Sequence, residues 1–369
     1  MLPRPLNITL VSSQPHWGGG EQWLWWLGRG LASRGCRVSW IAQANSGLAQ
    51  RAEAAGEPLF VTPGRGRRAV DLWNVRKFLR KQQPDVLHLN DSHSVFWVGV
   101  ASLGPSSPVR LACKHTIFPL RSPLKYRLLV ERVICVSHAA RQACLTAGLP
   151  EEKTWMIYTG VEPPPSSADD RPWALRTLGW PADTELITAV GNLQACKGHS
   201  YLLQAMAALK KSTPAARLVI VGEGEERAAL EALIEKHQLH AHAKLVGFRT
   251  DAARWLSAAD VVVQPSLSEA LSLVAVEAQM LGKPLVAAAV GGLSEVIAAD
   301  AAEPYAWIVN PREPEEIARG LQRALERDAV VRERCARAQA AAFERFGMDR
   351  FITQMIEQYH NLIHLRRAA

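Results

Sequence analysis

The chain has 369 residues and carries 43 Lys and Arg against 35 Asp and Glu, for a formal net charge of +8. This length predicts two domains, since one domain usually takes about 100–200 residues. A hydrophobic fraction of 48% is ordinary for a globular protein and excludes a disordered chain. No stretch approaches the ~20 apolar residues that cross a bilayer, so we expect no transmembrane helix.

Two features of the sequence bear on its location. Residues 1–15 have the pattern of a first strand and lack the apolar run and small-residue cleavage site of a signal peptide. The six cysteines are scattered, contain no CxxC pair, and in several cases lie in apolar runs, as buried thiols do. A reducing cytoplasm fits this pattern best, and we expect a cytoplasmic protein.

The charge is unevenly distributed. Residues 1–155 contain 20 Lys and Arg against 9 Asp and Glu, whereas the remainder contains 23 against 26. A basic first half indicates an anionic partner: a membrane surface, a phosphorylated acceptor or a nucleic acid. Cations interleaved with apolar residues favour the inner face of an anionic membrane, although an ordinary surface helix has the same pattern. These cations are Arg65, Arg67, Arg68, Arg76, Lys77, Arg80, Lys81, Arg121, Lys125 and Arg127.

Strand-like and helix-like segments alternate along the whole chain. Continuous apolar strands between helices indicate parallel sheets that are covered on both faces. This regularity favours an α/β fold of two doubly wound domains over one large sheet. The predicted strands are Asn7–Val11, Val38–Ala42, Asp85–Leu89, Val109–Cys113, Arg132–Val136, Leu186–Val190, Arg217–Val221, Lys244–Val246, Val261–Gln264 and Pro284–Ala288. A further strand is predicted to end at residues 158–161.

A proline-rich polar segment marks the domain boundary. Its composition excludes a helix and a central strand, so residues 161–172 are predicted to link a first domain, 1–160, to a second, 173–347. The tail 348–369 has apolar residues at helical spacing and no strand after it. We therefore expect a terminal helix that packs on a surface already built.

Three consecutive glycines follow the first predicted strand. Gly18, Gly19 and Gly20 precede the helical segment Gln22–Ser33. Glycines at such a turn let a ligand approach the backbone, and the free N–H groups at a helix start attract a phosphate or a sugar hydroxyl. A plain tight turn is an equal alternative, because the GxGxxG spacing of a dinucleotide fold is absent.

Similar turns follow strands of the predicted second domain. Gly191 and Asn192 follow one strand and precede Lys197, and Gly222 follows the next strand. Ligands of open α/β sheets bind at the carboxyl ends of the strands, where a lysine beside glycines suits a phosphate. A solvated lysine and a simple turn are the alternatives.

The segment after Val261–Gln264 carries the strongest chemical signal. Glu269 precedes a predicted helix from Ser272 to Leu281, and Glu277 lies near the middle of that helix among apolar residues. A carboxylate in such surroundings is costly unless donors reach it. We expect Glu277 to bind the two hydroxyls of a ribose and the helix start to hold a phosphate. A pair of ordinary helix glutamates is the alternative.

Together, these motifs resemble a known family. The segment PSLSEALSLVAVEAQMLGKPLVAAAVGGLSEVI, which holds Glu269 and Glu277, is similar to the signature block of the retaining GT-B glycosyltransferases of family 4, or glycosyl transferases group 1. The glycine turns also match in order, so the resemblance covers nearly the whole chain. It implies two Rossmann-like domains facing across a cleft, the first for an acceptor and the second for a nucleotide-sugar donor. It also implies that the terminal helix crosses back to the first domain.

The resemblance also assigns roles to residues. It implies that Lys197 contacts the donor diphosphate, Glu277 the ribose, and Glu269 the hydroxyls of the transferred sugar. His115, after Val109–Cys113, matches a histidine near that sugar, although a lone histidine is often structural. The donor-binding set expected on these grounds also contains Gly18, Gly19, Gly20, Gly191, Asn192, Gly222, Phe248, Arg249, Leu271, Ser272 and Leu273.

Two parts of the motif depart from the family pattern. Asn192 stands where an arginine is common, so either Lys197 and helix dipoles suffice for the phosphates or another arginine, such as Arg249, moves in. Ala270 and Ser272 stand where glycines are frequent, which narrows the backbone freedom. We expect this variation to affect sugar choice and to leave activity intact.

The resemblance implies a retaining transferase that moves a hexose to a glycan or glycolipid acceptor, without a metal or another cofactor. Envelope polysaccharide or lipopolysaccharide-core assembly at the inner membrane face is the expected setting. A non-catalytic sugar- or nucleotide-binding protein would share the sheets but would not need Lys197 or the two glutamates. A nucleic-acid-binding protein would show a recognised motif, and none is found, so we expect no nucleic-acid partner. A GT-B epimerase or phosphorylase is an alternative among enzymes.

Overall fold

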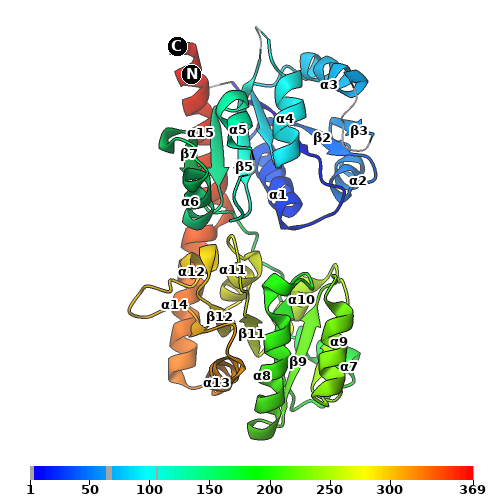
Figure 1. The fold of residues 1–369 in the computed structure, drawn as a ribbon, viewed down its shortest axis with the longest axis vertical. Helices are drawn as coiled ribbons and strands as arrows, with labels where there is room; N and C mark the ends of the chain where they lie inside the picture. The colour runs from blue at the N-terminus through cyan, green and yellow to red at the C-terminus, as the bar shows by residue number, and fades with distance from the viewer. Residues whose placement is uncertain (1–3, 64–68, 105–106, 121, 369) are drawn as a thin grey trace. The chain divides into compact units, whose positions relative to one another are not determined.

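The protein, as a computed structural model, is described over residues 4–63, 69–104, 107–120 and 122–368. It divides into two compact units, one formed by Met1–Glu162 with Phe346–Ala369 and the other by Pro163–Arg345. Each unit contains one parallel sheet with helices packed against it (Figure 1). No helix within the described ranges has both the length and the apolar character needed to cross a bilayer.

The first unit is built on a seven-stranded parallel sheet in the order β3-β2-β1-β4-β5-β6-β7. The interior strand β1 places Ile8 opposite Val38 of β2 and Val86 of β4. Its strands are β1 (Asn7–Ser12), β2 (Arg37–Gln43), β3 (Leu59–Thr62), β4 (Val86–Leu89), β5 (Val109–Lys114), β6 (Arg132–Cys135) and β7 (Thr154–Met156). Its helices are α1 (Gly19–Ser33), α2 (Gly47–Ala54), α3 (Ala69–Gln82), α4 (Ser92–Ala101), α5 (Pro123–Leu129), α6 (His138–Thr146) and α15 (Met348–Ala368).

The second unit is built on a six-stranded parallel sheet in the order β10-β9-β8-β11-β12-β13. Its strands are β8 (Glu185–Val190), β9 (Ala216–Val221), β10 (Ala243–Leu245), β11 (Val261–Gln264), β12 (Leu285–Ala288) and β13 (Trp307–Val309). Its helices are α7 (Asp170–Leu178), α8 (His199–Ser212), α9 (Arg227–Lys236), α10 (Ala252–Ala258), α11 (Leu273–Met280), α12 (Gly291–Val296), α13 (Pro314–Leu325) and α14 (Ala329–Phe346). The predicted α/β class with two Rossmann-like units is confirmed.

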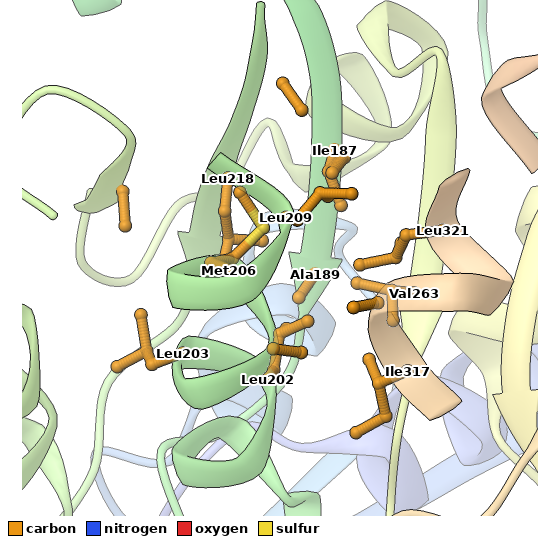
Figure 2. Close-up of a cluster of buried hydrophobic side chains, with 14 of the residues drawn as sticks. Ile187, Ala189, Leu202, Leu203, Met206, Leu209, Leu218, Val263, Ile317 and Leu321 are labelled. Carbon is orange, nitrogen blue, oxygen red and sulfur yellow. The ribbon is translucent and has the colours of Figure 1, made fainter. Parts of the chain in front are cut away.

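Alternate residues of the second sheet face opposite helix layers. Ile187 and Ala189 of β8 pack with α8 and α13, whereas Leu186 of the same strand packs on the other face with α7 and α10. Figure 2 shows Met206 of α8 lying against Leu218 of β9 in the first of these clusters. Burial on both faces explains why these strands are continuous apolar runs.

The terminal helix α15 packs on the first unit, against α1 and β5, as predicted. A Cβ at Gly30 of α1 would lie 2.4 Å from Ile352, so this glycine makes room for the helix. The hydroxyl of Tyr359 lies 2.8 Å from Nδ1 of the buried His88. The buried side chains of α15 are Phe351, Ile352, Met355, Tyr359 and Leu362.

The prediction from the sequence is wrong in two respects, the edge strands and the bounds of the linker. It misses the edge strands β3 and β13, which are too short to show a recognisable alternation. It also extends the predicted linker 161–172 too far, because α7 begins at Asp170. Pro172 lies in the first turn of α7, where its missing N–H leaves no helical hydrogen bond unmade. The predicted start of the second domain at residue 173 therefore falls inside a helix.

Candidate functional site

Glycines at the carboxyl edge of the second sheet let neighbouring loops pack backbone against backbone. Gly222 has φ +155°, and a Cβ there would lie 1.9 Å from the carbonyl oxygen of Gly191. Gly198 has φ +71°, and a Cβ there would lie 2.0 Å from the carbonyl oxygen of Pro265. Any other residue would force these loops apart. The glycines therefore serve loop packing, a role that the turn pattern did not predict.

The packed loops bring Lys197 and Glu269 into an ion pair. Nζ of Lys197 lies 2.5 Å from Oε1 of Glu269, and the two side chains are 21% and 10% exposed. Gln264 Nε2 and Ser266 Oγ donate to the same oxygen over 3.2 Å and 3.1 Å. Three donors thus hold Oε1. Among the described residues, Oε2 has no hydrogen-bond partner, so it can accept from a ligand.

Gln264 and Ser266 are site residues that the sequence analysis missed. Gln264 is 4% exposed at the end of β11, and Ser266 is fully buried. The sequence does contain one signal for this site: the polar residue Gln264 ends the strand directly after three valines. Buried polar side chains need hydrogen-bond partners, and here the shared partner is the carboxylate of Glu269.

Glu277 lies in α11 with a desolvated carboxyl group. Burial raises its pKa from 4.5 to about 7, and no described residue donates a hydrogen bond to it. Because the raised pKa belongs to the folded state, the stability linked to Glu277 is full below pH 4.5 and falls as the pH rises through 7. The residue as a whole is still partly exposed to solvent. Hydroxyl donors from a ligand can therefore reach the carboxyl group and favour its ionised form.

Ser272 caps α11 in a strained conformation. Its φ is +79°, in the region that favours glycine, and its Oγ accepts a hydrogen bond from the Ala275 backbone N–H at 3.3 Å. Leu271 before it is buried and Leu273 after it begins the helix. The predicted restriction of backbone freedom at Ser272 is therefore present as an unfavourable φ.

Phe248 and Arg249 do not join the Lys197–Glu269 cluster. The guanidinium of Arg249 pairs with both carboxylate oxygens of Asp251, over 2.9 Å and 2.8 Å. Phe248 is 64% exposed. In this structure the guanidinium of Arg249 is thus engaged by Asp251, and Asn192 carries no charge.

The other predicted site residues lie in the first unit. Gly18 is the N-cap of α1 and has no side chain to occupy the free N–H groups of the first turn, which begins at Gly19. A Cβ at Gly20 would lie 3.6 Å from both Asn90 and His115, so this glycine is packed against the histidine. Gly20 and His115 are thus brought together.

Asn90 determines the protonation pattern of His115. Asn90 Nδ2 donates to the carbonyl of Gly20 at 3.0 Å, so its Oδ1 accepts from His115 Nε2–H at 2.7 Å. The Nδ1 atom lies 3.8 Å from Sγ of Cys113. Burial lowers the pKa of His115 to about 4, so the ring is neutral and Nδ1 can only accept. A sugar hydroxyl at Nδ1 would have to donate its proton.

His115 borders a cavity of about 550 Å³ that belongs entirely to the first unit. The carboxyl group of Glu21 lies in its wall, accepts from Ser12 Oγ at 3.0 Å, and has its pKa raised by burial. Asp91 is also in the wall, but it caps α4 by accepting from the backbone of His93 and Ser94. Polar groups in a concave pocket of this size suit a hydroxyl-rich small molecule.

Two family models match the chain. The model described as Glycosyl transferases group 1 matches residues 171–345, and the model described as Glycosyltransferase Family 4 matches residues 17–163. A D-inositol 3-phosphate glycosyltransferase of Xylanimonas cellulosilytica is 35% identical over 216 residues, 55% of this chain and 48% of that protein. An uncharacterized glycosyltransferase of Methanocaldococcus jannaschii is 33% identical over 241 residues, 62% of this chain and 59% of that protein. The chain thus spans about half the length of the curated relatives it matches.

Solved structures share the fold over almost the whole chain. Anabaena HepE, determined with UDP and glucose, aligns with a TM-score of 0.82 at 24% identity, over 96% of this chain and 99% of that chain. WaaG, a glycosyltransferase involved in lipopolysaccharide biosynthesis, aligns with a TM-score of 0.66 at 18% identity, over 91% and 95%. At these identities the likeness establishes the GT-B fold.

Two substitutions at Ser272 separate strain from capping. Ser272→Gly relieves a backbone conformation that costs about 1–3 kcal/mol and loses only a few tenths from the cap, so we expect a more stable second unit. Ser272→Ala keeps the strain and loses the cap, which should lower the free energy of unfolding by about 1 kcal/mol. Urea unfolding measures both, with Ser166→Gly, at an exposed position before α7, as the control. A Ser272→Gly protein less stable than the parent would contradict stored strain at this position.

Proposed function

Because the chain belongs to the glycosyl transferases group 1 family, we propose that it transfers a sugar from a nucleotide diphosphate sugar to a hydroxyl group of an acceptor. The observation that carries this proposal is the Lys197–Glu269 pair with Glu277 on the adjoining helix, at the carboxyl edge of one sheet. A cation, an oriented carboxylate and a desolvated carboxyl group suit the diphosphate, the sugar and the ribose of such a donor.

Donor binding would change the partners of Lys197. A diphosphate brings more negative charge to Nζ than the single carboxylate of Glu269 does, so Lys197 would turn toward the phosphates. Glu269 would keep Gln264 and Ser266 as donors and gain sugar hydroxyls at Oε2. In the transition state, charge grows on the leaving diphosphate, and a cation already in place stabilises it.

We propose that the transferred sugar is a hexose and that its anomeric configuration is retained. The acceptor oxygen would form its bond to the anomeric carbon on the face from which the diphosphate leaves, and a diphosphate oxygen would take the acceptor proton. Glu269 suits hydroxyl binding better than nucleophilic attack, because three donors hold one of its oxygens. Charge neutralisation by Lys197 and helix N–H groups supports a reaction that needs no metal.

The proposed setting is assembly of an envelope glycan at the inner membrane face, in the cytoplasm. The solved relative WaaG is described as acting in lipopolysaccharide biosynthesis, and the acceptor class here, a glycan or glycolipid, is proposed partly on that likeness. A non-catalytic sugar- or nucleotide-binding protein is the second candidate, since the same sheets could hold a nucleotide without turnover.

Incubation with a panel of UDP-, GDP- and ADP-sugars tests the proposal. A transferase releases nucleoside diphosphate only with its own donor, and proton NMR of the product reports the anomeric configuration. Binding of a nucleotide sugar without release of diphosphate, in the presence of a broad acceptor mixture, would favour the non-catalytic candidate. A product with inverted anomeric configuration would contradict attack from the face that the diphosphate leaves.

Lys197→Met should remove the cation that meets the leaving group. We expect kcat to fall about 100–1,000-fold, because one preorganised charge-stabilising donor usually contributes that much. Steady-state release of nucleoside diphosphate measures the effect. Lys236→Met, at an exposed position on α9, is the matched control and should keep the parental rate. Equal rates for the two variants would remove Lys197 from the mechanism.

Nucleotide binding should release a proton from Glu277. Its pKa is about 7 because of burial, and ribose hydroxyls favour the ionised form, so binding at pH 6 should lower the pKa and expel the proton. Calorimetric titration with UDP in two buffers of different ionisation enthalpy measures the released protons. Release should disappear in Glu277→Gln and persist in Glu315→Gln, an exposed residue of α13. Identical proton release in all three proteins would place the ribose elsewhere.

Exposed apolar side chains lie among cations on the neighbouring helices α3, α4 and α5. Trp73, Phe96 and Leu128, one on each helix, are 62%, 60% and 68% exposed. The described cations on α3 and α5 are Arg76, Lys77, Arg80, Lys81, Lys125 and Arg127. The predicted membrane cations Arg65, Arg67, Arg68 and Arg121 lie outside the described residues. We propose that this surface rests on an anionic membrane, because it combines apolar anchors with positive charge.

Membrane binding should weaken with salt and with loss of the anchors. Trp73→Ser combined with Leu128→Ser should lower the affinity for phosphatidylglycerol vesicles by about tenfold or more, while UDP affinity stays unchanged. Vesicle co-sedimentation at low and high salt measures this. Phe343→Ser, which removes a 44% exposed side chain from α14 in the second unit, is the control. An absence of binding to anionic vesicles at low salt would end this part of the proposal.

A further inference from the structure

The cavity of the first unit contains a buried positive charge that the donor chemistry does not use. Lys114 is the last residue of β5, at the carboxyl edge of the first sheet, and it lines the cavity of about 550 Å³ beside His115 and Thr116. It is only 7% exposed, and it alone among the lysines of the described ranges is buried to this degree.

The partners of Lys114 are neutral. Its Nζ donates to Thr116 Oγ1 at 3.0 Å and to the carbonyl oxygen of Phe118 at 2.5 Å. Across the described part of the chain, no carboxylate lies within ion-pair distance of this ammonium group. Burial lowers the pKa of Lys114, which reflects the cost of keeping the charge out of water.

The two acids of the cavity wall are committed to other donors. Asp91 accepts from the backbone and hydroxyl of Ser13 as well as from the first turn of α4. Glu21 accepts from Ser12, and burial raises its pKa, so it brings less negative charge than an exposed glutamate. A buried ammonium group without a counter-ion is unfavourable, and an anion that enters the cavity would supply one.

We propose that this cavity binds the acceptor of the transfer reaction and that the acceptor carries an anionic group, a phosphate or a carboxylate, which pairs with Lys114. The proposal rests on the glycosyl transfer proposed above and names its acceptor class: a phosphorylated or acidic sugar. Thr116 Oγ1 can donate to the same anion, because it already lies beside Nζ. The neutral polar groups of Asn90 and His115, together with Glu21, leave hydrogen-bonding positions for sugar hydroxyls in the same wall.

A binding experiment with three matched methyl glucosides tests this inference. The probes are methyl glucoside, its 6-phosphate and the corresponding methyl glucuronoside, titrated calorimetrically into the full chain saturated with UDP. We expect at least one charged probe to bind about tenfold or more tightly than the neutral one, because the charge pair forms away from water. Comparison of the 6-phosphate with the glucuronoside shows whether the site prefers a phosphate or a carboxylate.

Three variants assign the effect to Lys114. Lys114→Gln should remove the preference for the charged probe without weakening the neutral one, and Lys114→Arg should keep part of it. Arg37→Gln, an exposed cation at the amino end of β2, should bind all three probes as the parent does. Because Lys114→Gln removes an unpaired buried charge, its thermal midpoint without anions should equal or exceed that of the parent, which also shows that the variant is folded.

Two outcomes overturn the inference: equal affinity for charged and neutral probes, or a charge preference that survives in Lys114→Gln. UDP titration separates these results from failure of the proposed function. Normal UDP binding with no preference for charged probes rejects only the acceptor class. Loss of UDP binding by the parental protein would reject the nucleotide-sugar donor itself.

Discussion

The ion pair between Lys197 and Glu269 is the interaction on which the proposed donor site depends. Its two residues come from the loops after β8 and β11, and they meet because Gly198 lets the first loop touch the backbone of Pro265 in the second. Gln264 and Ser266 then hold the carboxylate by the same oxygen that Lys197 uses. A charged pair so enclosed is unfavourable unless its donors and acceptors are satisfied. Oε2 of Glu269 has no hydrogen-bond partner among the described residues and is available to a ligand.

The six strands of the second sheet follow the same order as the first six of the first sheet, but the two units differ in the chemistry at their carboxyl edges. The second unit presents an ion pair and the desolvated carboxyl group of Glu277. The first presents the neutral Asn90–His115 pair, packed on Gly20, and the cation of Lys114, which has no carboxylate partner among the described residues. Parallel sheets bring loops from distant parts of the chain to one edge, so the same scaffold can serve two different ligands.

Much of the architecture could be read from the sequence, because apolar strands alternating with amphipathic helices leave few other folds open. The terminal helix was also predictable, since the stripe with Phe351, Met355 and Tyr359 needs a surface to cover it. The edge strands β3 and β13 were not, because three or four residues carry no clear period. The start of α7 was hidden by Pro172, which suits a first helical turn as well as a linker.

For the candidate site, the residue types and their order could be recognised in the sequence: a lysine beside glycines, and two glutamates around a helix start. The folded structure was needed to show that Lys197 pairs with Glu269, that Arg249 is engaged by Asp251, and that Ser272 adopts a positive φ. It was also needed to show that Lys114 is buried with no carboxylate of the described residues within ion-pair distance. Spacing along the chain encodes local structure, whereas burial and charge pairing depend on which loops the sheet brings together.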